Sequence, residues 1–125
     1  MWPLDLGAAI VLVWGIAHIL PTKAMVRSFG PLSPDSRRII TMVWVAEGLA
    51  LVFIGSITLI VATSAAPGDP TALLVFRLCA AGLTVLAAWT LIAGFWTSVL
   101  PIRICPAVVL TAVALILFGT AGWTS

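Results

Sequence analysis

Three ionisable side chains lie inside long apolar stretches of this sequence, and they are the groups best suited to chemistry: His18, Glu47 and Arg77. A charge near the centre of a membrane helix costs about 2.5 to 3.5 kcal/mol on insertion scales, so such groups face the interior of a bundle and find a partner there. An imidazole and a carboxyl can also exchange protons with a bound molecule. The three residues therefore form one candidate site.

The elements that must position them are membrane-spanning helices. Hydrophobic residues make up 62% of the 125 residues and charged residues only 8%, which is too apolar for a soluble domain of this size. Four stretches approach or exceed the ~20 residues needed to cross a bilayer, and their apolar residues are continuous rather than alternating, which favours helices over strands. We predict an all-α, four-helix transmembrane bundle that forms a single integral membrane domain over residues 1–125. Its helices are expected at about 4–20, 34–63, 70–100 and 106–123.

The basic residues are distributed unevenly between the connections. Five of the six fall in the first and third connections, and the second connection and both tails contain none: the five are Lys23, Arg27, Arg37, Arg38 and Arg103. The positive-inside rule then places both termini outside the cytoplasm. We expect an integral protein of a bacterial cytoplasmic (inner) membrane.

The first connection has an amphipathic pattern. Over residues 22–29 the basic residues alternate with Met25, Val26 and Phe29. This pattern predicts either a short amphipathic turn along the inner membrane interface or an ordinary basic loop.

The heights of the two opposite charges predict an ion pair. At about 1.5 Å per residue, Glu47 lies about 14 Å below the cytoplasmic face and Arg77 about 10 Å below the other face. Across a core of about 30 Å their heights then differ by roughly 6 Å, within reach of an arginine side chain. A Glu47–Arg77 pair would form the polar floor of a ligand pocket, or alternatively fix helix register without further function.

Two tryptophans extend this candidate site. Trp14 precedes His18 by one helical turn, and Trp44 precedes Glu47 by three residues, so each ring shares a face with a polar group. We expect the two faces to converge on a cavity open towards the cytoplasmic leaflet, or else His18 to snorkel at the interface. The predicted ligand-binding residues are Trp14, His18, Trp44, Glu47 and Arg77.

Other site classes have little support. One histidine and two cysteines, Cys79 and Cys105, provide no metal-ligand spacing, and the cysteines fall in different apolar segments, so a disulfide is not expected. A redox role of these thiols stays open. A net charge of +2 with localised carriers does not indicate nucleic-acid binding.

Small residues recur at helical spacing and predict packing surfaces, because small side chains let membrane helices approach closely. They are Gly48 and Gly55 in the second predicted helix, Ala81, Thr84 and Ala88 in the third, and Ala107, Thr111 and Ala114 in the fourth.

Two short motifs resemble a known family. The run Gly15-Ile16-Ala17-His18-Ile19-Leu20-Pro21 resembles the G-x-x-[KH]-[FL]-x-x-P end of the first helix in DoxX-like membrane proteins, and Ala46-Glu47-Gly48-Leu49, leading to Gly55, resembles the pattern of their second helix. The resemblance covers about the first half of the chain. It implies a small four-helix bundle associated with quinone-linked or thiol-redox systems, with His18 and Glu47 as the matching positions. Arg77 has no counterpart in these motifs.

These observations favour a membrane protein that holds a small lipophilic ligand, a quinone or a lipid, inside the bundle. Quinone is the candidate cofactor, and membrane lipid the expected partner. Three alternatives stay open: an enzyme in which Glu47 and His18 transfer protons, as an isomerase or in quinone-linked redox; a non-catalytic subunit that packs in a homo-oligomer or a larger membrane complex; and a small transporter.

Overall fold

The chain folds into a bundle of helices, as predicted. The computed structural model describes residues 2–94, 96–97 and 100–123. Its helices are α1 (Trp2–Ile19), α2 (Thr22–Ser28), α3 (Pro34–Ser64), α4 (Pro70–Gly94) and α5 (Leu100–Ala121). Four of the helices, α1, α3, α4 and α5, are long and apolar enough to cross a membrane, so the protein is an integral membrane protein.

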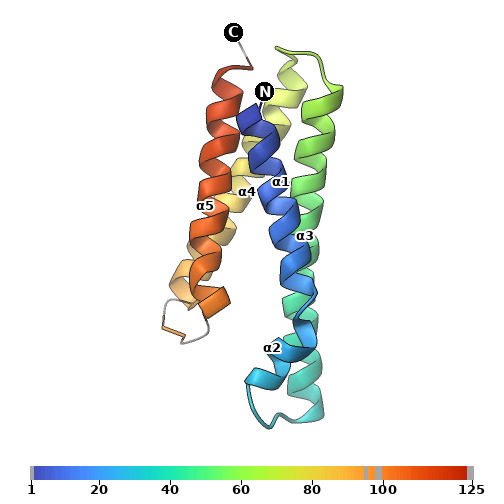
Figure 1. The fold of residues 1–125 in the computed structure, drawn as a ribbon, viewed down its shortest axis with the longest axis vertical. Coiled ribbons are helices and arrows are strands. Elements are labelled where there is room, and N and C mark those ends of the chain that lie inside the picture. The colour runs from blue at the N-terminus through green and yellow to red at the C-terminus, as the bar shows by residue number, and fades with distance from the viewer. Residues whose placement is uncertain (1, 95, 98–99, 124–125) are drawn as a thin grey trace.

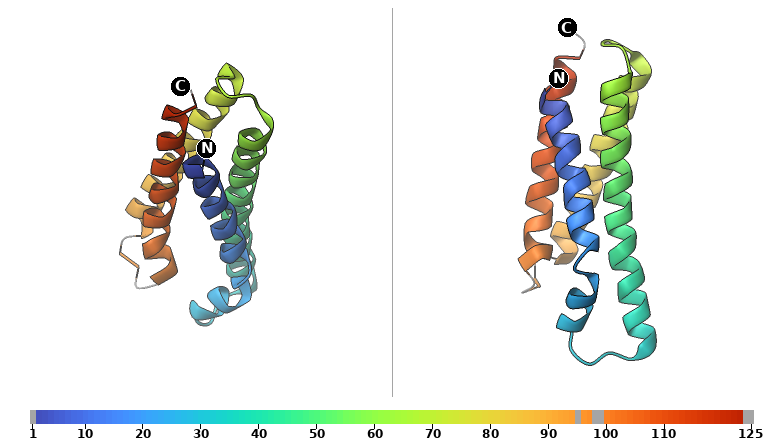
Figure 2. Two further views of the ribbon diagram at one scale, coloured as in Figure 1. Left: turned by 45° about the horizontal axis from the view of Figure 1, so that its top comes forward. Right: turned by 45° about the vertical axis from the view of Figure 1, so that its right-hand side comes forward.

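The long helices do not pack equally on one another. Helix α1 packs on both α3 and α5, and α4 packs mainly on α5 (Figure 1). Helices α3 and α4 are joined by a short connection at one end and diverge towards the other, as all three views show (Figures 1 and 2). The bundle is therefore tight around α1 and loose between α3 and α4.

Side-chain caps followed by proline begin the two central helices. The Ser33 hydroxyl accepts a hydrogen bond from the backbone N–H of Ser36, and the Asp69 carboxylate accepts one from that of Ala72. The next residue in each case is a proline, whose missing N–H costs nothing in the first turn of a helix. These local signals set where α3 and α4 begin.

The boundary between the last two helices differs from the predicted one. Helix α4 ends at Gly94 rather than residue 100, and the backbone N–H of Thr97 turns back to the Gly94 carbonyl at 3.1 Å. Helix α5 begins at Leu100 rather than residue 106, so Pro106 lies inside it. The first turn of α5 already contains Pro101, which is the proline that marks its start. Residues 95 and 98–99, also within the predicted third helix, lie outside the described residues.

Glycines bring the backbones of α1 and α3 into contact. A Cβ atom on Gly15 would lie 2.7 Å from the backbone nitrogen of Val52, and one on Gly55 would lie 2.6 Å from that of Leu12. Both distances are too short for a side chain, so only glycine allows this approach. The small residues predicted as a packing surface on α3 therefore serve that purpose.

The small residues of the other two helices face outwards instead. All six are exposed: Ala81, Thr84 and Ala88 on α4, and Ala107, Thr111 and Ala114 on α5. These six residues therefore do not form the close contacts between helices of this chain. Their packing against another chain stays a prediction. Their spacing marks a helix face correctly, but spacing alone does not say which side that face turns to.

The basic connection contains a helix. In α2, Val26 is buried while Lys23 and Arg27 are exposed, so the amphipathic turn predicted for residues 22–29 is present. Helix α2 and the beginning of α3 project beyond the ends of α4 and α5 (Figure 1). With the orientation predicted from the charges, this projection is on the cytoplasmic side.

Candidate functional site

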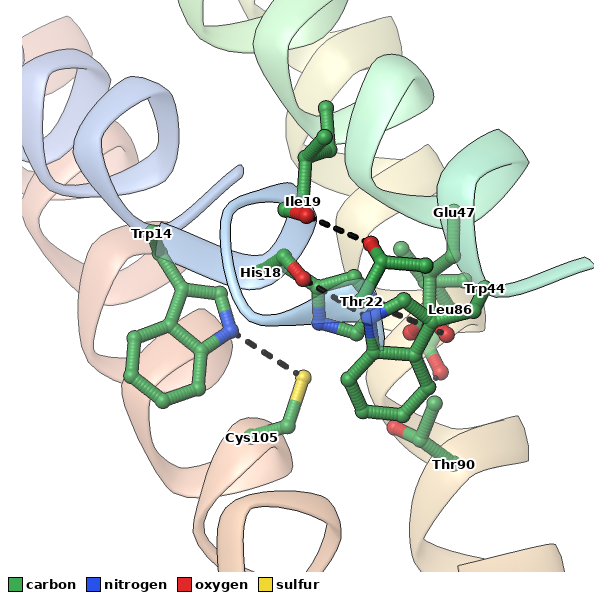
Figure 3. A network of polar contacts seen from close by, with 9 residues as sticks. All are labelled: Trp14, His18, Ile19, Thr22, Trp44, Glu47, Leu86, Thr90 and Cys105. Carbon is green, nitrogen blue, oxygen red and sulfur yellow. Dashed lines mark hydrogen bonds and ion pairs between the residues drawn. The ribbon is translucent and has the colours of Figure 1, made fainter. Parts of the chain in front are cut away.

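His18 lies in the last turn of α1 and is held by Trp44 of α3. The two rings stack with centroids 4.0 Å apart and planes 12° from parallel. The indole Nε1 of Trp44 also donates a 2.7 Å hydrogen bond to the backbone carbonyl of His18. That carbonyl lacks a helical partner because α1 ends at Ile19, just before Pro21. Trp44 thus fixes both the backbone and the ring of His18 (Figure 3).

Glu47 lies next to His18 on the same side of α3 as Trp44. Its Oε2 atom is 3.7 Å from His18 Nε2, and the two side chains are 23% and 7% exposed, respectively. This separation is too long for a hydrogen bond. The Nε2 atom is buried and has no hydrogen-bond partner among the described residues. Buried polar atoms are nearly always paired, so an unpaired ring nitrogen opposite a carboxyl is where a ligand atom or a water would fit.

A small cavity lies in front of this pair. This inner cavity has a volume of about 160 Å³ and is lined by residues of α1, α3, α4 and α5: His18, Trp44, Glu47, Thr90, Ile102 and Cys105. His18 and Glu47 thus contribute the ionisable groups of an inner cavity whose lining is mostly apolar.

A larger cavity adjoins the first. This outer cavity, of about 480 Å³, shares Glu47, Thr90 and Ile102 with the inner cavity, and its lining includes Leu86 and Trp89 of α4. Most of its lining comes from α3 and α4. These two helices diverge towards one end of the bundle (Figure 2). The inner cavity is therefore separated from the wider apolar space on the loose side of the bundle only by side chains that line both.

Trp14 contributes indirectly. Its Nε1 atom donates to the sulfur of Cys105 at 3.3 Å, while the ring packs partly buried against the core. It does not line the inner cavity, but it orients the thiol that does. Cys105, Thr90 and Ile102 were missed from the sequence because nothing in their spacing indicates that α4 and α5 face His18.

Arg77 lies outside this site, and the predicted ion pair is wrong. Its side chain is exposed on α4, and the described residues contain no ion pair between it and Glu47. The residue of α4 beside Glu47 is Leu86, nine positions further along, which is about 14 Å at the helical rise. The prediction assumed a span of about 30 Å, but the 31 residues of α3 extend to about 46 Å. Glu47 is therefore much further from the α3–α4 connection than the sequence estimate placed it.

Within the described ranges, no group of three or more His, Cys, Asp or Glu side chains is placed to hold a metal ion. Both cysteines are free thiols.

The comparisons with known proteins add no relative. No protein-family model matches the chain, and no curated protein or solved structure is significantly similar to it. The DoxX-like resemblance of the first two long helices stays a prediction.

Proposed function

We propose that the protein binds a small lipophilic molecule with a polar head, a quinone or a lipid, and that His18 and Glu47 hold the head. The observation that carries the proposal is the buried Nε2 atom of His18, which has no hydrogen-bond partner in the described part of the chain and faces Glu47 across 3.7 Å.

The two groups suit a carbonyl or hydroxyl oxygen. A neutral imidazole nitrogen donates or accepts one hydrogen bond, and a carboxyl accepts from a hydroxyl or, when protonated, donates to a carbonyl. An oxygen in the inner cavity, to one side of the line that joins the two atoms and within hydrogen-bond distance of both, would supply the missing partner of Nε2 and a partner for the carboxyl. The Trp44 ring stacked on His18 keeps that nitrogen aimed at the same point.

The surroundings favour a ligand that arrives from the membrane. The outer cavity lies between α3 and α4 and has apolar side chains such as Leu86, Trp89 and Ile102 in its lining. A head group in the inner cavity would leave its apolar tail in this space, next to the lipid chains. A water-soluble ligand would gain little from such a lining.

The test compares the molecules that co-purify with the protein. Wild type and the double variant His18→Gln/Glu47→Gln are extracted in mild detergent, and bound small molecules are identified and quantified by mass spectrometry. Losing one hydrogen bond to a charged group costs about 1.5 to 3 kcal/mol, so ligand content should fall at least about tenfold. The control Asp35→Asn removes an exposed acid in the first turn of α3 and should retain the ligand. Equal ligand content in all three proteins would refute the proposal.

A second candidate is an enzyme, because an acid and a base that face each other over a gap can transfer protons to a bound molecule. Here one of the two groups, in its protonated form, would give a proton to one atom of the bound molecule, while the other, in its unprotonated form, takes a proton from a second atom. The single variant Glu47→Gln distinguishes the two functions. If Glu47→Gln retains the ligand but no longer converts it to a product, the protein is an enzyme. If wild type does not convert the ligand either, the protein only binds it.

A further inference from the structure

A third pocket lies between α2 and the beginning of α3, at the end of the molecule that the charge distribution predicts to be cytoplasmic. Its volume is about 270 Å³, and it is lined by Thr22, Lys23, Val26, Arg27, Arg37 and Thr41. It shares none of these residues with the inner or outer cavity. A ligand bound here would therefore touch neither His18 nor Glu47.

Three cations from two helices line this pocket. Lys23 and Arg27 come from α2 and Arg37 from α3, and the buried side chain of Val26 fixes α2 against the rest of the molecule. In the part of the chain that the structure describes, no carboxylate lies within ion-pair distance of any of the three. Asp35, in the first turn of the same helix as Arg37, is exposed and pairs with none of them.

The two threonine hydroxyls of the pocket already donate to backbone carbonyls, so only the three basic side chains remain as side-chain donors for a ligand. Thr22 donates its hydroxyl hydrogen to the carbonyl of Ile19, and Thr41 donates to the carbonyl of Arg37 at 2.8 Å. An anion in the pocket would therefore be held by an ammonium and two guanidinium groups, which match the oxygens of a phosphate.

The position of the pocket points to a lipid as the source of that phosphate. Thr41 precedes Glu47 by six residues, about 9 Å along α3 towards the cytoplasmic end. Leu20 and Met42, beside the pocket residues in sequence, are exposed apolar side chains. Basic side chains and exposed apolar side chains in neighbouring turns of the same segments match the head group and the first part of the chains of one molecule.

We propose that this pocket binds the phosphate group of an anionic phospholipid of the cytoplasmic leaflet. Lys23, Arg27 and Arg37 contact the phosphate, and the lipid chains lie along α3 below it. The bound lipid fixes α2 at the membrane interface.

The test is native mass spectrometry of the purified protein in detergent, titrated with dioleoylphosphatidylglycerol. We expect one lipid per chain to bind tightly and dioleoylphosphatidylcholine to bind at least about tenfold more weakly, because its head group has no net charge. Lys23→Gln and Arg37→Gln should each weaken phosphatidylglycerol binding about tenfold, as expected for a lost hydrogen bond to a charged group. Because the two substitutions lie on different helices, one folded variant is enough for the test.

The matched control is Arg38→Gln, which removes the same charge from the next residue of α3 but outside the pocket. It should leave phosphatidylglycerol binding within about twofold, because exposed charges further away are screened. If Arg37→Gln and Arg38→Gln weaken phosphatidylglycerol binding equally, this pocket is not the lipid site. Equal binding of the two lipids would likewise refute the proposal. Complete displacement by millimolar inorganic phosphate would overturn the lipid as the source of the phosphate.

Discussion

Helix α3 has two contrasting neighbours. On the α1 side, the backbones of the two helices are in direct contact, because glycines such as Gly15 and Gly55 have no side chain to keep them apart. Towards α4 it lines a cavity of about 480 Å³. In a membrane the lipid chains are as apolar as the side chains, so close packing needs small residues that face each other. On α4 such residues face outwards, and α3 and α4 separate where Glu47 lies.

The candidate site lies on the boundary between the tight and the loose side. His18 belongs to the tight α1–α3 contact, which fixes it through Trp44. Glu47 faces the loose side, where a ligand can approach. A site of this kind needs both a rigid support and an opening, and the two faces of α3 provide one each.

The largest expected effect is on the tight side. Gly55→Leu would place a side chain 2.6 Å from the backbone nitrogen of Leu12, so α1 and α3 must separate. We expect the free energy of unfolding to fall by about 3 kcal/mol or more, as at a severely overpacked core position. Thermal unfolding in detergent measures it. Gly82→Leu is the matched control, because a Cβ atom there meets no atom within 4 Å. Equal melting temperatures for the two variants would contradict the description of the α1–α3 contact.

An intermediate effect is expected where the two sides meet. Trp44→Phe keeps an aromatic ring on His18 but removes the donor to its backbone carbonyl. Leaving that buried carbonyl unpaired should destabilise the protein by about 1 to 2 kcal/mol and lower its ligand content. The control Trp89→Phe changes an exposed ring on the loose side and should not affect stability. If Trp44→Phe melts like wild type, the hydrogen bond is not what holds His18.

The smallest effect on stability is expected on the loose side. Ala93→Leu adds volume to the lining of the outer cavity at a residue that is itself exposed. The free energy of unfolding should change by no more than about 0.5 kcal/mol, as for most surface substitutions. Ligand content should nevertheless fall, because the added side chain occupies the space of the tail. Unchanged ligand content at unchanged stability would show that the outer cavity is not the route to Glu47.

The sequence predicts the four long helices because lipid requires continuous apolar stretches of about 20 residues or more. Caps and prolines such as Ser33 and Pro34 mark where the central helices begin. The convergence of Trp44 and Glu47 on His18 follows from their three-residue spacing, which places both on one face of α3. The Arg77 prediction is wrong because it converted residue numbers to depth with a fixed membrane thickness, whereas α3 is longer than that thickness. The contribution of Cys105 and Thr90 depends on how α4 and α5 are placed, which no local pattern encodes.

The central claim is that a ligand atom in the inner cavity bridges His18 and Glu47. An experimental high-resolution density map of the protein extracted in mild detergent tests it directly. The account predicts non-protein density within hydrogen-bond distance of both His18 Nε2 and a Glu47 carboxyl oxygen, continuing between α3 and α4. A map in which α4 closes against α3, or in which the gap holds only a water molecule, would contradict it.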